Sequence, residues 1–176
     1  KLIKPSVCEF FRFIDVTSGH PFPGTGGLSK FAEGLVKIDV QNQIIFVLDN
    51  DSEGVEAFKK IIKMKLPHNM SCICLPDLKE FESFPTCGPD GLTLSNINGT
   101  AAAIECYLDL TYSEYDSYIV RWTNYKKETG MYQGALEFKE YYAKRYLDTS
   151  EVKLIESKYD TSKLEALLNA IIDACS

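Results

Sequence analysis

The feature that most constrains the fold is the segment IIFVLDNDSEG, residues 44–54, in which an apolar run passes directly into two acidic residues and a glycine. A short apolar run bounded by turn residues is typical of a strand buried on both faces, here residues 43–48. From Ser52 onward, apolar residues recur at helical spacing at Val55, Phe58, Ile61, Ile62 and Leu66, and Pro67 ends the pattern. A buried strand leading into an amphipathic helix is the repeating unit of α/β proteins.

Other parts of the chain repeat these two patterns. Strands are predicted at residues 10–16 and 71–75, and helices at residues 28–38, 100–108, 134–146 and 161–174. In the last of these helices, Thr161 or Ser162 and Glu165 are the expected capping residues. Residues 84–91 are rich in Pro and Gly and are predicted to form turns. The alternation predicts an α/β fold with a mostly parallel sheet, helices on both of its faces, and a C-terminal helical extension.

Composition limits the class of protein. A chain of 176 residues with 45% hydrophobic residues is the size of one globular domain, and no apolar run approaches the roughly 20 residues of a membrane-spanning helix. We therefore expect no membrane partner. The six cysteines include no C-x-x-C pair, so we interpret them as buried thiols of a cytoplasmic protein. The chain begins at Lys1, and we expect it to be a piece of a longer protein.

A net charge of −6 argues against nucleic-acid binding by bulk electrostatics alone. It is compatible with a carboxylate site that meets phosphates through bound divalent cations, because such ions reverse the local charge.

The two carboxylates of LDNDSEG are the main candidate site. Residues i and i+2 of an extended chain point to the same side, about 6 to 7 Å apart, so Asp49 and Asp51 could flank a hydrated divalent ion. They follow a predicted parallel strand, at the sheet edge where α/β proteins bind ligands. The alternative is a solvated turn in which Asp51 or Ser52 caps the next helix.

Other protein classes share an Asp-x-Asp motif. A calcium-binding EF-hand loop is excluded because its twelfth position would be Lys60 instead of Glu. Phosphatases of the haloacid dehalogenase type expect Thr or Val where Glu53 stands. Sugar-nucleotide transferases remain compatible with the motif.

Five blocks, in this order, resemble one family. FFRFID followed by PGTGG, then LDNDSEG, LPDLKEFESFPTCGPDGL, NINGTAAAIECYL and RWTNYKKETGMYQGALEFK are similar to the Toprim part of bacterial HEPN/Toprim-fused proteins. These proteins are related to the overcoming-lysogenization-defect nucleases. The resemblance covers roughly residues 8 to 147. It implies a Toprim domain over residues 1–147 and a helical tail over residues 148–176.

The resemblance also implies a chemistry. Asp49 and Asp51 would be catalytic residues that bind Mg²⁺ or Mn²⁺, and Glu105 would add a second metal position. The first Toprim strand and its Glu should precede residue 10, where nothing matches, so the resemblance implies a fragment that lacks this general base. The parent protein would hydrolyse phosphodiester bonds of DNA or RNA, in antiphage defence. The alternatives are primase-like nucleotidyl transfer and a non-catalytic module that regulates a fused HEPN domain.

Further residues are candidates for nucleic-acid contacts. Gly26 and Gly27 could present backbone N–H groups to a phosphate at a helix start, although a flexible connection is equally compatible with these glycines. Arg121, Lys126 and Lys127, near Trp122, could bind a nucleic-acid backbone or form an ordinary solvated surface. The two histidines, His20 and His68, are expected at the surface. The absence of the first strand leaves an open sheet edge through which a homodimer could form.

Overall fold

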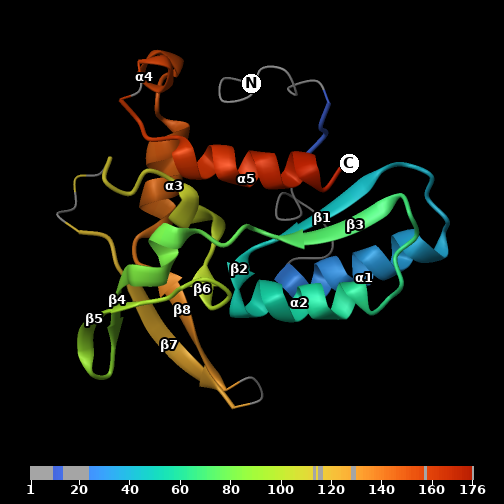
Figure 1. Ribbon diagram of the computed structural model, residues 1–176, viewed down its shortest axis with the longest axis horizontal. Coiled ribbons are helices and arrows are strands. Elements are labelled where there is room, and N and C mark those ends of the chain that lie inside the picture. Colours follow the sequence, from blue (N-terminus) through green and yellow to red (C-terminus); the bar gives the residue numbers. More distant parts are fainter. Residues whose placement is uncertain are drawn as a thin grey trace.

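The computed structural model describes residues 10–13, 24–112, 114, 117–127, 130–156 and 158–175, and these residues form a mixed α/β fold (Figure 1). The first elements are α1 (Gly24–Lys37), β1 (Ile44–Leu48), β2 (Asn50–Asp51), α2 (Ser52–Ile62) and β3 (Met70–Cys74). This order agrees with the alternation that the sequence predicts, although α2 ends at Ile62, before the predicted end at Leu66. The strand predicted at residues 10–16 is not formed over residues 10–13, and its remainder lies outside the described residues.

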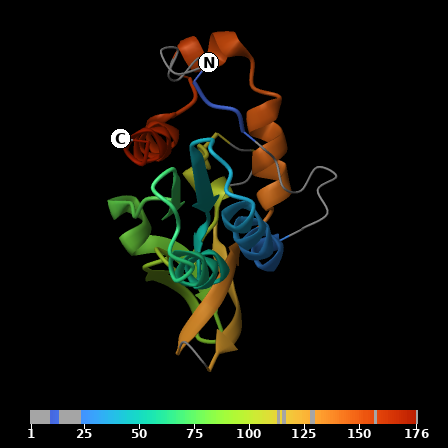
Figure 2. The same cartoon turned by 90° about the vertical axis from the view of Figure 1, so that its right-hand side faces the viewer.

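The parallel pair β1–β3 is covered by helices on both faces. The two strands pair in register from Ile44 opposite Met70 to Leu48 opposite Cys74. Side chains of a strand alternate between its faces. Phe46 and Leu48 accordingly pack with residues of α1 and α2, whereas Val47 belongs to the cluster that contains the apolar stripe of α5 (Ser162–Asp173). Figures 1 and 2 show α1 and α2 on one side of this pair and α5 on the other.

A second sheet of four strands has the order β5-β4-β7-β8. Its strands are β4 (Phe84–Gly88), β5 (Gly91–Ser95), β7 (Val120–Lys126) and β8 (Met131–Leu136). Only the β4–β7 pairing is parallel, and β4–β5 and β7–β8 are antiparallel. The described sheets are therefore mixed, whereas the sequence predicts a mostly parallel one.

The turn predicted at residues 84–91 is in fact a strand that enters a hairpin. The hydroxyl of Thr86 lies 3.0 Å from the hydroxyl oxygens of both Thr93 and Ser95 on β5, and Gly91 supplies the positive φ of 94° that the tight turn requires. Cross-strand contacts thus stabilise a segment whose local composition favours turns.

The helix predicted at residues 100–108 is not formed. Its residues instead form the short strand β6 (Ala101–Ala102) and the 3₁₀ helix η3 (Ile104–Tyr107). Ala101 and Ala102 are fully buried and pair with β2, so tertiary contacts override the helix propensity of alanine.

The helix predicted at residues 134–146 begins later, as α3 (Lys139–Leu147), because Gly134 belongs to β8. A Cβ atom at position 134 would lie 2.8 Å from side-chain atoms of Trp122 and Val120. The strand therefore passes its neighbours too closely for any residue other than glycine.

The C-terminal helix is confirmed as α5, with Leu164, Leu167 and Ile171 buried. Its N-cap residue is Thr161, one of the two predicted, but the side chain of Thr161 makes no capping hydrogen bond, and the carboxylate of Asp160 accepts one from the backbone N–H of Ser162 at 2.9 Å. The hydroxyl of Thr161 instead donates to Glu165. The other described elements are the 3₁₀ helix η2 (Lys79–Ser83) and α4 (Glu151–Ile155).

No helix in the described part of the chain has the length and apolar character needed to cross a bilayer. The five described cysteines, Cys72, Cys74, Cys87, Cys106 and Cys175, are free thiols.

Candidate functional site

Asp49 lies at the carboxyl end of β1, as the sequence predicts, and is fixed by a distant part of the chain. Its Oδ1 atom accepts a hydrogen bond of 2.9 Å from the backbone N–H of Ile104, in η3. This bond orients the carboxylate and places Glu105, the next residue along, near the end of β1.

Asp51 caps α2. Its Oδ1 atom accepts a hydrogen bond of 2.7 Å from the backbone N–H of Gly54, and its backbone is extended, as an N-cap requires. The capping role that the sequence left open is therefore confirmed for Asp51. Capping occupies one carboxylate oxygen and leaves the second available to a ligand.

Gly54 allows α2 to begin this close to β1. A Cβ atom at position 54 would lie 2.0 Å from the backbone oxygen of Asp49, which is far inside van der Waals contact. Any other residue here would push the helix away from the strand end. The glycine of LDNDSEG thus sets the distance between the two acidic positions and the helix that follows them.

The electrostatics of Asp49 are those of a crowded, partly buried carboxylate. Burial, which is the largest cause, and the negative charges of Asp51 and Glu105 raise its pKa to about 6. The hydrogen bond from Ile104 and the positive charge of Lys139 act in the opposite direction. Asp49, Asp51 and Glu105 therefore interact through space, although Glu105 lies on a 3₁₀ helix instead of the predicted α-helix.

These acidic residues suit a metal ion that keeps several of its waters better than one that is held by protein ligands alone. Among the described residues, no group of three or more His, Cys, Asp or Glu side chains lies close enough to hold a metal ion. Mg²⁺ needs only one or two carboxylates, because it keeps several of its waters. The hydroxyl of Ser52, next to Asp51, is buried without a hydrogen-bond partner in the described part of the chain, which is unusual for a buried polar atom.

A thiolate metal site is not favoured at this position. Cys74 lies opposite Leu48 in the register of the parallel pair. Burial and the negative charges of Asp51, Asp77 and Asp49 raise the pKa of its thiol to about 11. A protonated thiol is a poor metal ligand. The donor atoms at this edge of the sheet are therefore carboxylate oxygens.

Asn50 is a buried polar residue of this edge that sequence reasoning missed. Its side-chain amide donates to Asp77 at 2.7 Å, and its Oδ1 atom accepts from the backbone N–H of Gly99 at 3.0 Å. Asn50 is 3% exposed, and it ties the end of β1 to the segments after β3 and before β6. A signal was present in the sequence, because Asp77 follows an apolar strand just as Asp49 does.

The cationic candidates lie on β7 and the turn after it. Arg121 is exposed and pairs with Glu137, and Lys127 is exposed in the turn. Lys126 reaches Glu56 of α2, with 3.7 Å between Nζ and Oε2, and Gln133 of β8 donates to Glu53 at 3.0 Å. The β7–β8 hairpin is therefore attached to the helix that Asp51 caps.

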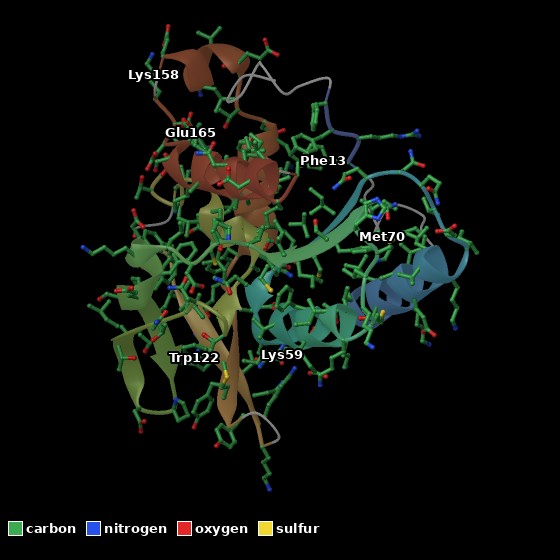
Figure 3. All side chains as sticks on the ribbon, turned by 45° about the vertical axis from the view of Figure 1, so that its right-hand side comes forward. Phe13, Lys59, Met70, Trp122, Lys158 and Glu165 are labelled. Carbon is green, nitrogen blue, oxygen red and sulfur yellow. The ribbon has the colours of Figure 1, made fainter. Side chains whose placement is uncertain are left out.

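Three aromatic side chains cluster on this hairpin, which extends away from the rest of the molecule (Figures 1 and 2). The ring centroid of Tyr132 lies 5.0 Å from that of Tyr125 and 6.3 Å from that of Trp122. Tyr125 and Tyr132 are 54% and 48% exposed. Figure 3 shows Trp122 on the same ribbon. We call Trp122, Tyr125 and Tyr132 the hairpin aromatic cluster.

The remaining predicted residues lie elsewhere. Gly26 and Gly27 belong to the first turn of α1 instead of a loop before it, because the helix begins at Gly24. The first N–H groups of a helix have no intrahelical acceptor, so both glycines stay at a helix start. His68 is exposed, and His20 lies outside the described residues.

Comparison with known proteins identifies no relative of this chain. No family model, curated protein or solved structure matches the chain. What the chain does must therefore be inferred from its own residues.

Proposed function

We propose that the chain is a Toprim-like domain and that its protein hydrolyses phosphodiester bonds of DNA or RNA with Mg²⁺ or Mn²⁺. The observation that carries the proposal is the Asp49 carboxylate, partly buried beside Asp51 and Glu105 at the carboxyl end of a parallel strand. Acidic side chains that repel one another are costly to hold together, and a bound divalent cation removes that cost.

The roles of the residues follow from their hydrogen bonds. The N–H groups of Ile104 and Gly54 each hold one carboxylate oxygen, of Asp49 and Asp51 respectively, which leaves the second oxygen of each free to bind an ion. Glu105 supplies further negative charge beside Asp49. A bound Mg²⁺ or Mn²⁺ would lower the pKa of a coordinated water and stabilise the leaving oxygen of a phosphodiester.

The hairpin supports a nucleic-acid substrate. Exposed aromatic rings stack on bases, and nearby cations attract the backbone. The hairpin aromatic cluster, with Arg121 and Lys127, lies on an element that contacts α2 through Lys126 and Gln133. A strand bound along the hairpin would thus pass close to the start of α2 and its acidic cap.

Cation binding tests the site directly. Mn²⁺ is titrated into the protein, and free Mn²⁺ is followed by electron paramagnetic resonance. Asp49→Asn and Asp51→Asn keep the hydrogen-bond acceptor of each side chain but remove its charge, so each is expected to weaken Mn²⁺ binding by at least about tenfold. Asp90→Asn, in the turn between β4 and β5, is the matched control and should bind like the unmodified protein. Unchanged binding in both site variants would contradict the proposal.

Activity is tested on the longest available form of the protein. Single-stranded and plasmid DNA and RNA are incubated with Mn²⁺, in parallel with labelled nucleoside triphosphates on a single-stranded template. Cleavage that Asp51→Asn abolishes supports hydrolysis. Incorporation of label without cleavage would instead support primase-like transfer.

A second candidate function is a non-catalytic regulatory module, for instance of a fused HEPN domain. The observation that favours it is that Asp49 and Asp51 each already accept a backbone hydrogen bond, from Ile104 and Gly54, so that both carboxylates have a structural role without a metal ion. This candidate predicts Mn²⁺ binding that is weak and unaffected by Asp49→Asn, together with no cleavage of any substrate.

A further inference from the structure

The outer strand of the four-stranded sheet, β5, has a neighbour on one side only. It pairs with β4, and no described strand pairs with its other edge. Figure 1 shows the β4–β5 hairpin at the lower left, at the outside of the molecule. Just after the strand, the N–H of Ile97 donates to the carbonyl of Phe81 in η2 at 2.9 Å, so the open edge is limited to β5 itself. The end strand of a sheet presents backbone N–H and C=O groups with which another strand can pair.

The side chains of β5 alternate in the opposite sense to that of an ordinary surface strand. Thr93 and Ser95 turn toward the face of Thr86, a fully buried residue whose hydroxyl lies 3.0 Å from the hydroxyls of both. Leu92 and Leu94 point to the other face and are 77% and 67% exposed. A sheet with one face in water normally places polar residues on that face. The exposed leucines are therefore best explained by a surface that covers them.

Two residues of β4 extend this apolar surface. Leu92 lies opposite Cys87, and Leu94 lies opposite Pro85, in the register of the pair. Residues that lie opposite each other in a strand pair share a face of the sheet. Cys87 and Pro85 are both partly exposed. The leucines therefore belong to a continuous patch, which we call the β5 apolar surface: Leu92, Leu94, Pro85 and Cys87.

The β5 segment is also uncharged. The sequence from Gly91 to Ile104 contains no Asp, Glu, Lys or Arg. Edge strands are normally protected from pairing by charged residues, proline or a bulge, and β5 has none of these. Arg121 of β7, which borders the β5 apolar surface across β4, is already paired with Glu137. Two copies of a chain with a net charge of −6 repel each other, so an uncharged edge is the place where they can meet.

We propose that β5 is the interface of a homodimer in which the β5 strands of two copies pair antiparallel. The sequence Leu-Thr-Leu is symmetrical about Thr93, which suits a copy of itself. A two-fold axis at Thr93 places Leu92 of each copy opposite Leu94 of the other, with all four leucines on one face. Asp90 then falls opposite Asn96, so no like charges face each other. The two sheets of four strands join into one sheet of eight.

This edge differs from the one at which the sequence predicts a homodimer, which would be left by a missing first strand. The inference goes beyond the proposed phosphodiester chemistry and does not depend on the Asp49 site. Asp49→Asn should therefore dimerise like the unmodified protein, and failure of the carboxylate site and failure of this interface are separately observable.

Dimerisation is measured by sedimentation equilibrium over about 1 to 100 μM protein, where the unmodified protein is expected to pass from monomer to dimer. The double variant Leu92→Lys/Leu94→Lys removes both leucines and places like charges opposite each other. It is expected to weaken dimerisation by at least about thirtyfold. Leu147→Lys changes a leucine that is 78% exposed at the end of α3, and this matched control should dimerise normally. Circular dichroism verifies that each variant is folded.

A second double variant tests the pairing register. Leu92→Lys/Leu94→Glu places opposite charges across from each other, so at low salt it is expected to dimerise at least about fivefold more tightly than Leu92→Lys/Leu94→Lys. Net charge alone would give the opposite order. The two lysines reduce the net charge from −6 to −4, whereas the lysine and glutamate together leave it at −6.

Three outcomes would overturn the inference. An unmodified protein that is still monomeric at about 100 μM would refute a second copy as the occupant, and an extended segment of another protein would become the alternative. A dimer that the folded Leu92→Lys/Leu94→Lys variant retains would be formed through another surface. Equal dimerisation of the two double variants would refute the antiparallel register.

Discussion

The carboxylate of Asp49 and the backbone N–H of Ile104 are joined by a hydrogen bond of 2.9 Å across 55 residues of sequence. This bond connects the end of β1 to η3 and brings Glu105 near the Asp-x-Asp pair. The same contact lowers the pKa of Asp49, yet burial and the neighbouring acids outweigh it. Asp49 is therefore well held in place but costly to ionise.

We expect Asp49→Asn to stabilise the metal-free protein at alkaline pH. The pKa of Asp49 is about 6 in the folded protein, above the ordinary value of 3.8 that it regains on unfolding. The folded state thus binds the proton more tightly, and stability is lost as the pH rises through 6. The variant escapes this loss, so urea unfolding with a chelator present should show a gain of about 2 to 3 kcal/mol at pH 8 and almost none at pH 3.

The exposed Asp90→Asn serves as control for this experiment and should change stability by less than about 0.5 kcal/mol at either pH. An Asp49→Asn variant no more stable than the unmodified protein at pH 8 would contradict the origin assigned to the pKa shift.

Gly54→Ala should destabilise the protein by about 2 kcal/mol or more, because its methyl carbon would lie 2.0 Å from the backbone oxygen of Asp49. Gly34→Ala, in α1, is the matched comparison, since nothing lies within 4 Å of the position its Cβ would take. That change should stabilise the protein by about 0.5 to 1 kcal/mol through helix propensity. Chemical denaturation measures both, and similar effects at the two glycines would refute the close approach of α2 to β1.

Asn50→Ala should cost about 2 to 3 kcal/mol of unfolding free energy. The change removes the hydrogen bond to Asp77 and leaves the N–H of Gly99 without its acceptor in a buried setting. The exposed Asn124→Ala, on β7, should cost less than about 0.5 kcal/mol. Equal costs would mean that the Asn50 network does not hold the edge of β1 together.

Tyr132→Ala should weaken binding of a fluorescent single-stranded oligonucleotide by about 1 to 3 kcal/mol, because the ring lies between Tyr125 and Trp122 on the exposed hairpin. Fluorescence anisotropy at fixed salt measures the effect. Phe10→Ala removes a ring that is 73% exposed outside the hairpin and should leave binding unchanged. Equal losses in the two variants would show that the hairpin aromatic cluster has no special role.

Local patterns in the sequence were sufficient to predict β1, α2, β3 and α5. Each of these elements has a continuous apolar run or an apolar stripe that is buried in the structure. The hairpin strands were not predictable in this way. β4 contains Pro85 and ends at Gly88, and it is held by pairing with β5 and with the distant β7, which no local pattern reveals.

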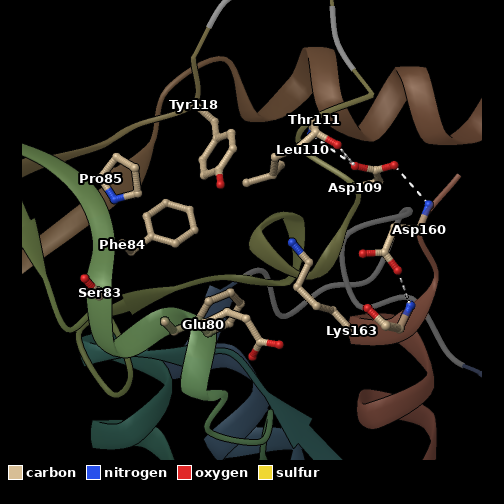
Figure 4. Close-up of a pocket in the computed structure, with 12 residues that line it drawn as sticks. Glu80, Ser83, Phe84, Pro85, Asp109, Leu110, Thr111, Tyr118, Asp160 and Lys163 are labelled. Carbon is tan, nitrogen blue, oxygen red and sulfur yellow. Dashed lines mark hydrogen bonds between the residues drawn. The ribbon is translucent and has the colours of Figure 1, made fainter.

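In the candidate site, too, the residues with a local sequence pattern were predictable and those placed by distant contacts were not. The place of Asp49 and Asp51 at a strand end was predictable, because the apolar run passes directly into these two acids. The sequence also offered Asp51 as one of two candidate caps of α2. The helix expected around Glu105 was wrong because burial of Ala101 and Ala102 against β2 and β8 outweighs alanine's helix propensity. The pocket that residues of η2, residues 109–111 and the start of α5 line (Figure 4) could not be predicted, because these segments converge only in the folded chain.

The contact between β3 and α5 has a consequence for synthesis of the protein. The hydroxyl of Ser71 lies 3.4 Å from the backbone oxygen of Ala174, 103 residues later, and the apolar stripe of α5 packs into the cluster that includes Ile73 of β3. Until α5 has emerged from the ribosome, this face of the parallel pair is exposed to water. Folding of the first half is therefore completed only after translation of the last described helix, and until then the open apolar face of these strands favours aggregation.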